Sequence, residues 1–198
     1  SVRDVMEPFF RGVCSNKSIQ TISFREVDLL GGDIFTMLGS FFKNNHNLTN
    51  ITITNCDLGG EGARLFALAI GSSTNKSLKE VSLVDNQIAD EGMVDVITAL
   101  SVFPHLQHVD LEGNHLRRNG CVALATLLWC SAKNLLLLDL SCNEINDDGI
   151  EALFPVLANC SHLKELHVSN NPSITTRGWQ RFATILEAPI SNLEELHI

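Results

Sequence analysis

The chain has 198 residues, 44% of them hydrophobic, and its 14 basic and 23 acidic residues give a formal net charge of −9. This apolar content is typical of a folded chain and argues against intrinsic disorder. No apolar run approaches the ~18 residues of a membrane helix, and the longest basic run is Arg117-Arg118. The sequence therefore predicts no membrane span and no nucleic-acid footprint.

An apolar triplet recurs along the chain, its second and third members three and five positions after the first. The interval between copies is 28 to 30 residues. The copies begin at Ile19, Leu48, Leu78, Leu106, Leu135 and Leu163, and Leu193 opens a seventh. A fixed period of this length is typical of a repeat solenoid. Each triplet predicts a short strand, because alternate residues of a strand face the same side.

A turn with a fixed polar residue follows each predicted strand. Three positions after the triplet, four repeats carry asparagine and the first two carry Val27 and Cys56; the asparagines are Asn86, Asn114, Asn143 and Asn171. An asparagine amide at a fixed turn can satisfy buried backbone groups. The sequence therefore predicts a ladder of buried asparagines, which Cys56 joins as a structural residue and not as a reactive thiol.

A helix is predicted after each turn. Apolar residues return four positions apart, as Val96 and Leu100 do, which places them on one helix face. A small residue precedes them in five repeats: Gly62, Gly92, Gly120, Gly149 and Gly178. The first repeat has Asp33 there, and Pro155 lies inside the fifth helix. The repeating unit is strand, turn and helix, and its apolar face is hidden only by stacking on its neighbours.

These repeats predict one domain over residues 1–198. It comprises a partial repeat at 1–18, repeats that start near 19, 48, 78, 106, 135 and 163, and a truncated repeat at 193–198. Solenoid ends normally carry capping repeats. We therefore expect either a piece of a longer protein or a chain that continues in its partner. The sequence does not indicate an oligomeric state.

Two segments, LQHVDLEGNHLRRNGCVALATLL and LLLLDLSCNEINDDGIEALFPVL, resemble the repeat of the ribonuclease-inhibitor-like leucine-rich-repeat family. The resemblance implies an α/β solenoid, a right-handed horseshoe with parallel strands on the concave face and helices on the convex face. It also implies a protein-binding module without enzymatic activity, although fold alone does not define function. Two alternatives remain open: a GTPase-activating regulator resembling the Ran GTPase activator, and the ligand-sensing repeats of a NOD-like receptor.

Motifs for catalysis or cofactor binding are absent from the sequence. There is no phosphate-binding glycine motif and no CxxC pair. His108, His167 and His197 fall on predicted strands beside acidic residues, and we interpret them as solvated surface residues. His167 and His197 could be neighbours, but no third metal ligand has a fixed spacing. We expect no cofactor and no metal. Trp129 and Trp179 are either local packing residues or contact anchors on the convex face.

The cysteines and the glycosylation motifs point to different compartments. The six cysteines are scattered, which favours free thiols in a reducing, cytoplasmic setting; they are Cys14, Cys56, Cys121, Cys130, Cys142 and Cys160. The first ten residues lack the order of a secretion signal. Five N-x-S/T motifs favour a secreted protein instead: Asn16, Asn47, Asn50, Asn75 and Asn159. Most lie just before a strand, however, where turn chemistry itself favours Asn and Ser.

Strand residues outside the triplets should face away from the core and line the concave face. Eight of them are acidic and only Arg25 is basic. The candidate contact residues are Glu80, Asp85, His108, Asp110, Glu112, Asp139, Glu165 and His167. Like charges on neighbouring strands cost stability, so this surface predicts a basic protein partner. The alternative is that the acids only keep an exposed sheet solvated.

Overall fold

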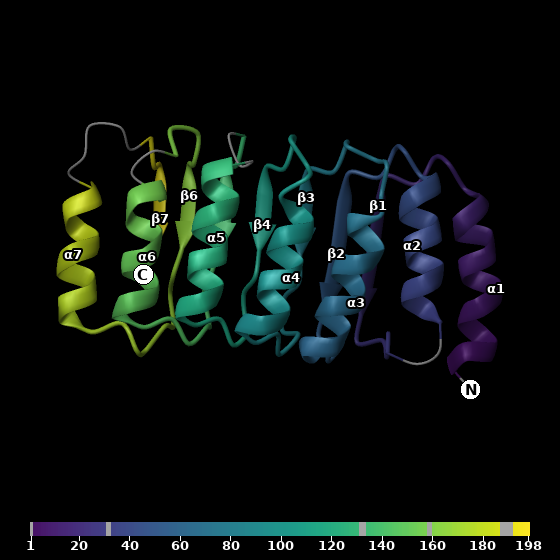
Figure 1. Cartoon of the computed structure of the whole chain (residues 1–198), viewed down its shortest axis with the longest axis horizontal. Helices are drawn as coiled ribbons and strands as arrows, with labels where there is room; N and C mark the ends of the chain where they lie inside the picture. Colours follow the sequence, from purple (N-terminus) through teal and green to yellow (C-terminus); the bar gives the residue numbers. More distant parts are fainter. Residues whose placement is uncertain (1, 31–32, 131–133, 158–159, 187–191) are drawn as a thin grey trace.

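The computed structural model describes residues 2–30, 33–130, 134–157, 160–186 and 192–198. Strand and helix alternate along the chain after an initial helix (Figure 1). The strands are β1 (Thr21–Arg25), β2 (Asn50–Thr54), β3 (Glu80–Ser82), β4 (His108–Asp110), β5 (Leu137–Asp139), β6 (Glu165–His167) and β7 (Glu195–His197). The helices are α1 (Val2–Ser15), α2 (Ile34–Asn44), α3 (Gly59–Gly71), α4 (Asp90–Leu100), α5 (Arg118–Cys130), α6 (Asp147–Leu157) and α7 (Thr176–Leu186).

The strands of the described ranges form one parallel sheet in chain order, from β1 to β7. Equivalent triplet residues are register partners, as in the pairs Ile51↔Val81 and Val81↔Val109. The helices form a single layer against one face of this sheet, and none of the described helices covers the other face (Figure 1). The predicted α/β leucine-rich-repeat solenoid is confirmed, and it includes the first repeat despite Asp33.

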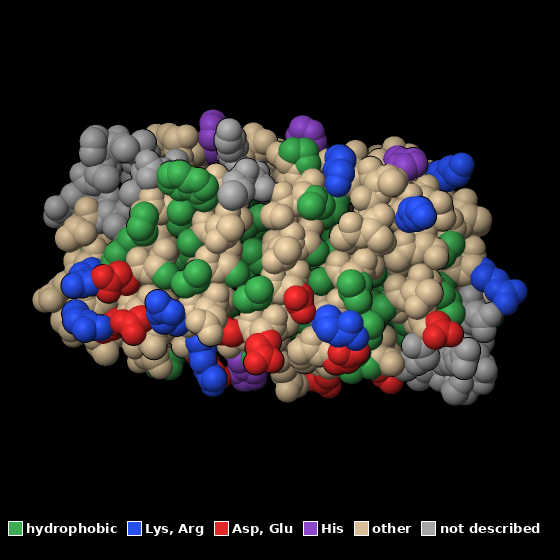
Figure 2. Space-filling view, viewed as in Figure 1, with side chains coloured by type: hydrophobic (Ala, Val, Ile, Leu, Met, Phe, Trp, Pro, Cys, Tyr) green, Lys and Arg blue, Asp and Glu red, His purple; other side chains and the backbone are tan. Residues whose placement is uncertain are grey.

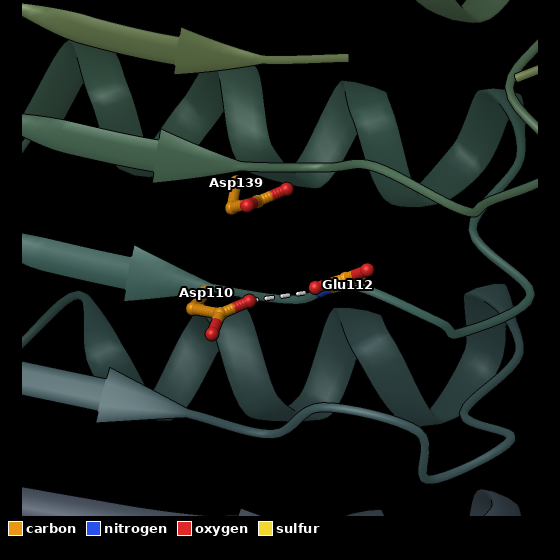
Figure 3. Close-up of side chains that lie close together, drawn as sticks. All are labelled: Asp110, Glu112 and Asp139. Atoms are coloured by element: carbon orange, nitrogen blue, oxygen red, sulfur yellow. Dashed lines mark hydrogen bonds between the residues drawn. The ribbon is translucent and has the colours of Figure 1, made fainter. Parts of the chain in front are cut away.

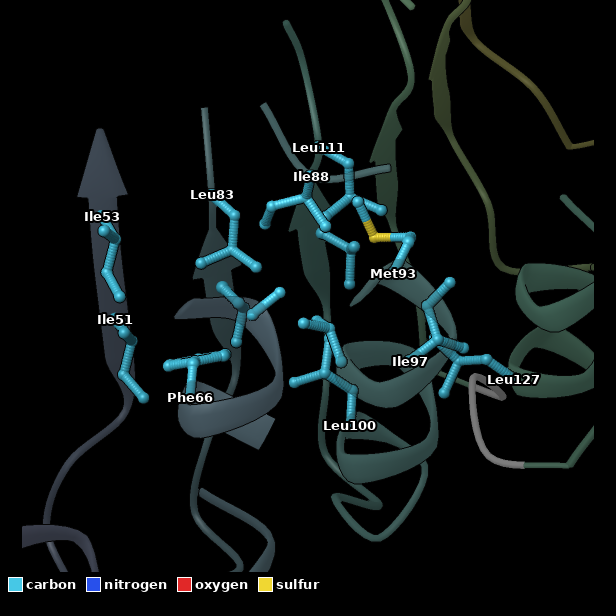
Figure 4. Close-up of a cluster of buried hydrophobic side chains, with 14 of the residues drawn as sticks. Ile51, Ile53, Phe66, Leu83, Ile88, Met93, Ile97, Leu100, Leu111 and Leu127 are labelled. Carbon is cyan, nitrogen blue, oxygen red and sulfur yellow. The ribbon is translucent and has the colours of Figure 1, made fainter. Parts of the chain in front are cut away.

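The core lies between the two layers. Side chains of the triplets, such as Ile53 and Leu83, face Phe66 of α3 and Leu100 of α4, and all four are fully buried (Figure 4). Burial of one such side chain contributes about 1.5–3 kcal/mol. Because every repeat adds the same layer of side chains, the core is continuous along the solenoid.

The recurring glycine marks the point where a helix begins against its predecessor. A Cβ atom on Gly92 would lie 2.9 Å from the Cβ of Ala63 and 3.1 Å from the Cα of Gly60. The second atom belongs to backbone, which cannot move aside cheaply. Glycine at this position therefore allows α4 to start in contact with α3. Pro155 is accommodated within α6.

The asparagine ladder is buried, as predicted. Asn86, Asn114, Asn143 and Asn171 are at most 5% exposed. Each side-chain oxygen accepts a hydrogen bond from the preceding repeat, as Asn86 does from the Cys56 amide at 3.1 Å. Each Nδ2 donates to backbone carbonyls of its own turn and of the preceding strand. Cys56 is buried at the same position, and its Sγ lies 3.3 Å from the Thr54 carbonyl oxygen.

A second set of asparagines occupies the loops that lead from helix to strand. Asn75, a predicted glycosylation motif, is 4% exposed, and its Nδ2 donates to the Leu48 carbonyl at 2.8 Å. Asn47 and Asn50 also use their Nδ2 atoms as donors within the fold, and the side-chain oxygen of Asn16 accepts the amides of its own turn. Asn159 lies outside the described residues. Turn and loop chemistry therefore accounts for Asn16, Asn47 and Asn75, whereas Asn50 is the first residue of β2 and donates to Glu80 of the next strand.

Five cysteines with described side chains are free thiols: Cys14, Cys56, Cys121, Cys142 and Cys160. We expect Cys142, which is exposed, to react first with a disulfide reagent such as dithiobis-nitrobenzoate. Burial raises the pKa of Cys121 to about 12, so that thiol should react only after unfolding. Titration of the unreduced, denatured chain should report close to six thiols. A count of two or fewer would contradict the predicted reducing compartment.

Candidate functional site on the open sheet face

The uncovered face of the sheet, named here the open sheet face, carries the strand residues that alternate with the triplets. The alternation is visible in the exposure of β1 and β2, in which every second residue is buried. Parallel register arranges the other residues in two rows. One row holds Thr21, Asn50, Glu80, His108, Leu137, Glu165 and Glu195. The second row holds Ser23, Thr52, Ser82, Asp110, Asp139, His167 and His197.

The first row is partly neutralised within the fold. The Asn50 amide donates to Glu80. The His108 Nδ1 lies 3.3 Å from Glu80 Oε1, and both side chains are more than 40% exposed. Farther along the row Glu165 lies beside Glu195. This row therefore presents one shielded carboxylate near β3 and two acidic residues near β6 and β7.

The second row links neighbouring strands by side-chain contacts. Ser82 Oγ donates to Asp110 Oδ2 at 3.1 Å. Asp139 Oδ2 lies 2.9 Å from His167 Nδ1, and the rings of His167 and His197 lie with their centroids 4.2 Å apart and their planes tilted by 41°. The row is consequently acidic in its middle and carries imidazoles at its C-terminal end.

Three carboxylates converge in the middle of the open sheet face: Asp110, Glu112 and Asp139 each offer an oxygen within 4.8 Å of the others (Figure 3). The Glu112 amide donates to Asp110 Oδ1 at 3.1 Å. Burial raises the pKa of Asp110, and the charges of Asp139 and Glu112 raise it further. No lysine or arginine in the described ranges pairs with the three carboxylates. We call these three residues the carboxylate cluster; its geometry suits a cation, either an ion or a cationic side chain.

Sequence reasoning named these three residues but did not recognise that they cluster. The signal was available, because Asp110 and Asp139 occupy the same position in consecutive repeats and are register partners. Spacing along the sequence does not by itself reveal a group that is assembled from two strands and a turn. The expected absence of a metal therefore stays a prediction.

The interpretation of His167 as a solvated residue is wrong. Its side chain is 21% exposed and that of Asp139 is 15% exposed. The His167 Nε2 is buried without a hydrogen-bond partner. No hydroxyl or thiol of the described residues bonds to this imidazole, so the Asp139–His167 pair lacks a nucleophile. Both residues can present charge to a partner, but they protrude less than His108, whose side chain is 41% exposed.

Asp85 lies in the turn after β3 and is exposed. Its backbone φ is 55°. The φ angles of its counterparts in other repeats are also positive, at Glu26, Asn55, Cys142 and Asn170. The next repeat has Gly113 here, and a Cβ on that glycine would lie 2.0 Å from Asp85 Oδ1. The missing side chain of Gly113 thus leaves room for the Asp85 carboxylate at the edge of the face.

Other singled-out residues lie away from this face. Arg117 forms an ion pair with Glu144, and Arg117 and His115 both lower the pKa of the Glu144 carboxyl. The Arg117-Arg118 pair is therefore a surface feature. Trp179 packs edge-on against Phe182 with centroids 6.0 Å apart, which confirms local packing. Trp129 is 68% exposed, so the local-packing interpretation is wrong for that residue.

We expect Asp110→Asn to stabilise the protein at neutral pH. The amide keeps an oxygen for the Glu112 amide and can donate to Ser82, while the repelled, partly buried charge disappears. The pKa of Asp110 is raised in the folded protein. As pH rises past the ordinary value of 3.8, Asp110 therefore ionises in the unfolded chain before it ionises in the folded protein, and the wild type loses stability. Solvent screening limits the gain to less than about 1 kcal/mol.

Urea unfolding at pH 7 and pH 3 measures this effect. The gain should be present at pH 7 and absent at pH 3, where Asp110 is protonated in both states. A loss of stability at pH 7 would show that the carboxylate is favourably placed and that the cluster is not strained.

The βα repeats and the exposed acidic sheet define a solenoid with one open face. The family profile "Leucine Rich repeat" matches residues 44–67, 74–96, 104–125, 131–154 and 159–183, more than half of the chain. The chain belongs to the leucine-rich-repeat family, with repeats of the ribonuclease-inhibitor type. Repeats of this family form protein-interaction modules. The structure adds β1 and α2, which precede the matched segments, to the repeat array.

Similar curated proteins have diverse names. Mouse "NACHT, LRR and PYD domains-containing protein 5" is 27% identical over 161 residues, 81% of this chain and 14% of that protein. Mouse "Ribonuclease inhibitor" is 26% identical over 191 residues, 94% of this chain and 40% of that protein. "RAN GTPase-activating protein 2" of Arabidopsis thaliana is 28% identical over 107 residues, which are 54% of this chain and 19% of that protein. The chain thus spans less than half of each relative. Separately, none of the described helices combines the length and apolar character needed to cross a membrane.

Proposed function

We propose that the chain binds a basic protein partner through the open sheet face and has no catalytic activity of its own. The observation that carries this proposal is the carboxylate cluster, in which Asp110, Glu112 and Asp139 converge without a lysine or arginine of the described chain to neutralise them. A lysine or arginine of a partner would relieve their mutual repulsion. The surrounding contact residues are Glu80, Asp85, His108, Glu165 and His167.

Physical chemistry favours a protein partner over a nucleic acid. Nucleic-acid binding normally needs a basic footprint, whereas the charged residues of the open sheet face are mainly acidic. A partly buried carboxylate that already bears a desolvation cost, as Asp110 does, loses less on contact with a partner than a fully hydrated one. The free thiols support a reducing, cytoplasmic location for this interaction.

Regulation of a GTPase is the second candidate, supported by the similarity to a RAN GTPase-activating protein. An arginine acting on a nucleotide would have to leave its present partners, since Arg117 is bonded to Glu144. A GTPase assay with the purified chain separates the two proposals. The ligand-sensing repeats of a NOD-like receptor are the third candidate, supported by the NACHT-containing relative.

Affinity capture tests the leading proposal. The wild-type chain and the double variant Asp139→Lys/Glu165→Lys are immobilised, and proteins retained from a native lysate are identified by mass spectrometry. We expect the variant to lose a set of basic proteins that the wild type retains. Equal recovery by both chains would show that the open sheet face is not the binding surface.

A further inference from the structure

A second surface lies on the helix layer, around Leu68 of α3. This leucine is 61% exposed, six positions after Gly62. The same position in the later helices is occupied by Thr98, Thr126, Pro155 and Thr184. The Thr98 and Thr126 hydroxyls donate to the backbone carbonyls four residues earlier, at 2.7 and 3.2 Å. The repeat itself therefore does not require an exposed aliphatic side chain at this position.

Two grooves flank Leu68. The groove between α2 and α3 has a volume of about 380 Å³ and includes Gly39, Leu65 and Ala69 in its lining. The groove between α3 and α4 has a volume of about 460 Å³ and includes Ala67, Ala99 and Val102. We call them the α3 grooves. Small side chains form much of both floors, and Leu68 and Ser72 border both grooves. Leu68 is thus an apolar ridge with a groove on either side. This shape accepts aliphatic side chains.

The charges around the α3 grooves differ from those of the open sheet face. Lys43 lines the first groove, and among the described residues no acidic side chain pairs with it. Arg64 and Asp95 line the second groove, and Arg64 is held by Glu61 at 2.7 Å. On this face the acidic side chains lie mostly along the lower margin, where Lys and Arg side chains are interspersed with them, and the upper right margin shows Lys, Arg and His side chains (Figure 2). Lys43 is thus a cation without a described acidic partner at the first groove, so this groove favours an acidic residue of an occupant.

We propose that the α3 grooves dock an acidic amphipathic helix of a partner protein. Packed helices lie ~8–10 Å apart, which is about the separation expected for grooves on either side of α3. Seven residues of a helix span ~10.5 Å. A helix crossing α3 can therefore place aliphatic residues i and i+7 in the two grooves, with residue i+3 or i+4 on Leu68. An acidic residue beside the first anchor then meets Lys43. This surface is separate from the open sheet face, so the proposal does not rest on the function proposed above.

The probe is a stapled helical peptide with Leu at positions i, i+3 and i+7 and Glu at the flanking positions. Amide resonances of the whole, isotope-labelled chain are followed by NMR during titration. We expect the resonances of α2, α3 and α4 to shift, and a peptide with its three leucines replaced by serine to have no effect. Leu68→Thr introduces the residue of the later repeats and should weaken binding about tenfold or more, as for an interface anchor.

Two further variants fill the hollows directly. Ser40→Trp and Thr98→Trp place a large ring over one groove each from exposed helix positions, and each should weaken binding about tenfold. Lys43→Glu should weaken binding several-fold. The matched control is Val122→Thr, since Val122 is 43% exposed on α5 but lines neither groove. This control should bind as the wild type does, and thermal melts of all variants should stay close to wild type.

Several outcomes would overturn the proposal. One is the absence of shifts in α2–α4 with the acidic peptide. Equal binding of a peptide with Lys in place of Glu would contradict the assigned charge. Concentration-dependent shifts of the same resonances without peptide would identify a second copy of this chain as the occupant. Unchanged affinity in both Leu68→Thr and Thr98→Trp would exclude the grooves.

Discussion

Asn143→Ala should lower the free energy of unfolding by about 1–3 kcal/mol, the cost of leaving a buried polar group unpaired. The Asn143 side chain is 4% exposed. Its oxygen accepts the Leu116 amide at 3.0 Å, and its Nδ2 donates to the carbonyls of Leu111, Leu140 and Ser141. Alanine leaves the Leu116 amide without this acceptor, whereas the Leu111 carbonyl loses one of its two donors and keeps the Asn114 Nδ2 at 3.1 Å. Because those groups belong to the preceding repeat, the substitution also weakens the interface between repeats.

Urea unfolding followed by circular dichroism measures the effect. Asn119→Ala is the matched control, since Asn119 is exposed in the first turn of α5 and its side chain has no described partner. The control should change stability by less than about 0.5 kcal/mol. A loss below that value in Asn143→Ala would show that water or a rearranged turn replaces the lost bonds. A transition that becomes broader would indicate that the repeats on either side unfold separately.

Features that repeat along the chain were predictable from the sequence. The triplets, the Asn86–Asn171 ladder and the glycines recur at one period, and each copy meets the same environment in its neighbour. The need for a small residue was evident, but its reason, the close approach of Gly92 to Gly60, depends on how two helices pack. The turn geometry was only partly evident. Among the turn positions with positive φ after the strands, Gly113, Asn55, Asp85 and Asn170 have residue types that favour it, whereas Glu26 and Cys142 give no such signal.

Features that arise once in the chain were not predictable in the same way. The carboxylate cluster depends on residues of β4, β5 and the following turn, and its proximity follows from register rather than from spacing in the sequence. His167 is partly buried, and its contacts with the His197 ring and the Asp139 carboxylate cross between repeats. The α3 grooves depend on small residues of three helices lying side by side. Each is a relation between repeats that differ, whereas periodicity reports what repeats have in common.

The double variant Asp110→Lys/Glu112→Lys should slow association with a basic partner by about 10- to 100-fold at low ionic strength. Long-range attraction between opposite charges raises association rates by one to three orders of magnitude. Reversal of two carboxylates converts the centre of the open sheet face from attractive to repulsive. Dissociation should also accelerate, because Asp139 alone would remain to contact the partner's cation.

Surface plasmon resonance with a captured partner at several salt concentrations provides the measurement. The wild-type association rate should fall as salt is added, since the Debye length shrinks to ~8 Å near 0.15 M. Glu91→Lys/Asp95→Lys on α4 is the charge-matched control, because it changes the net charge equally but on the helix layer. A uniform effect of net charge would slow both variants alike, whereas a local site slows only the variant of the carboxylate cluster. If the helix-layer variant alone loses binding, the partner uses the α3 side of the molecule. The acids of the open sheet face would then serve only its solvation.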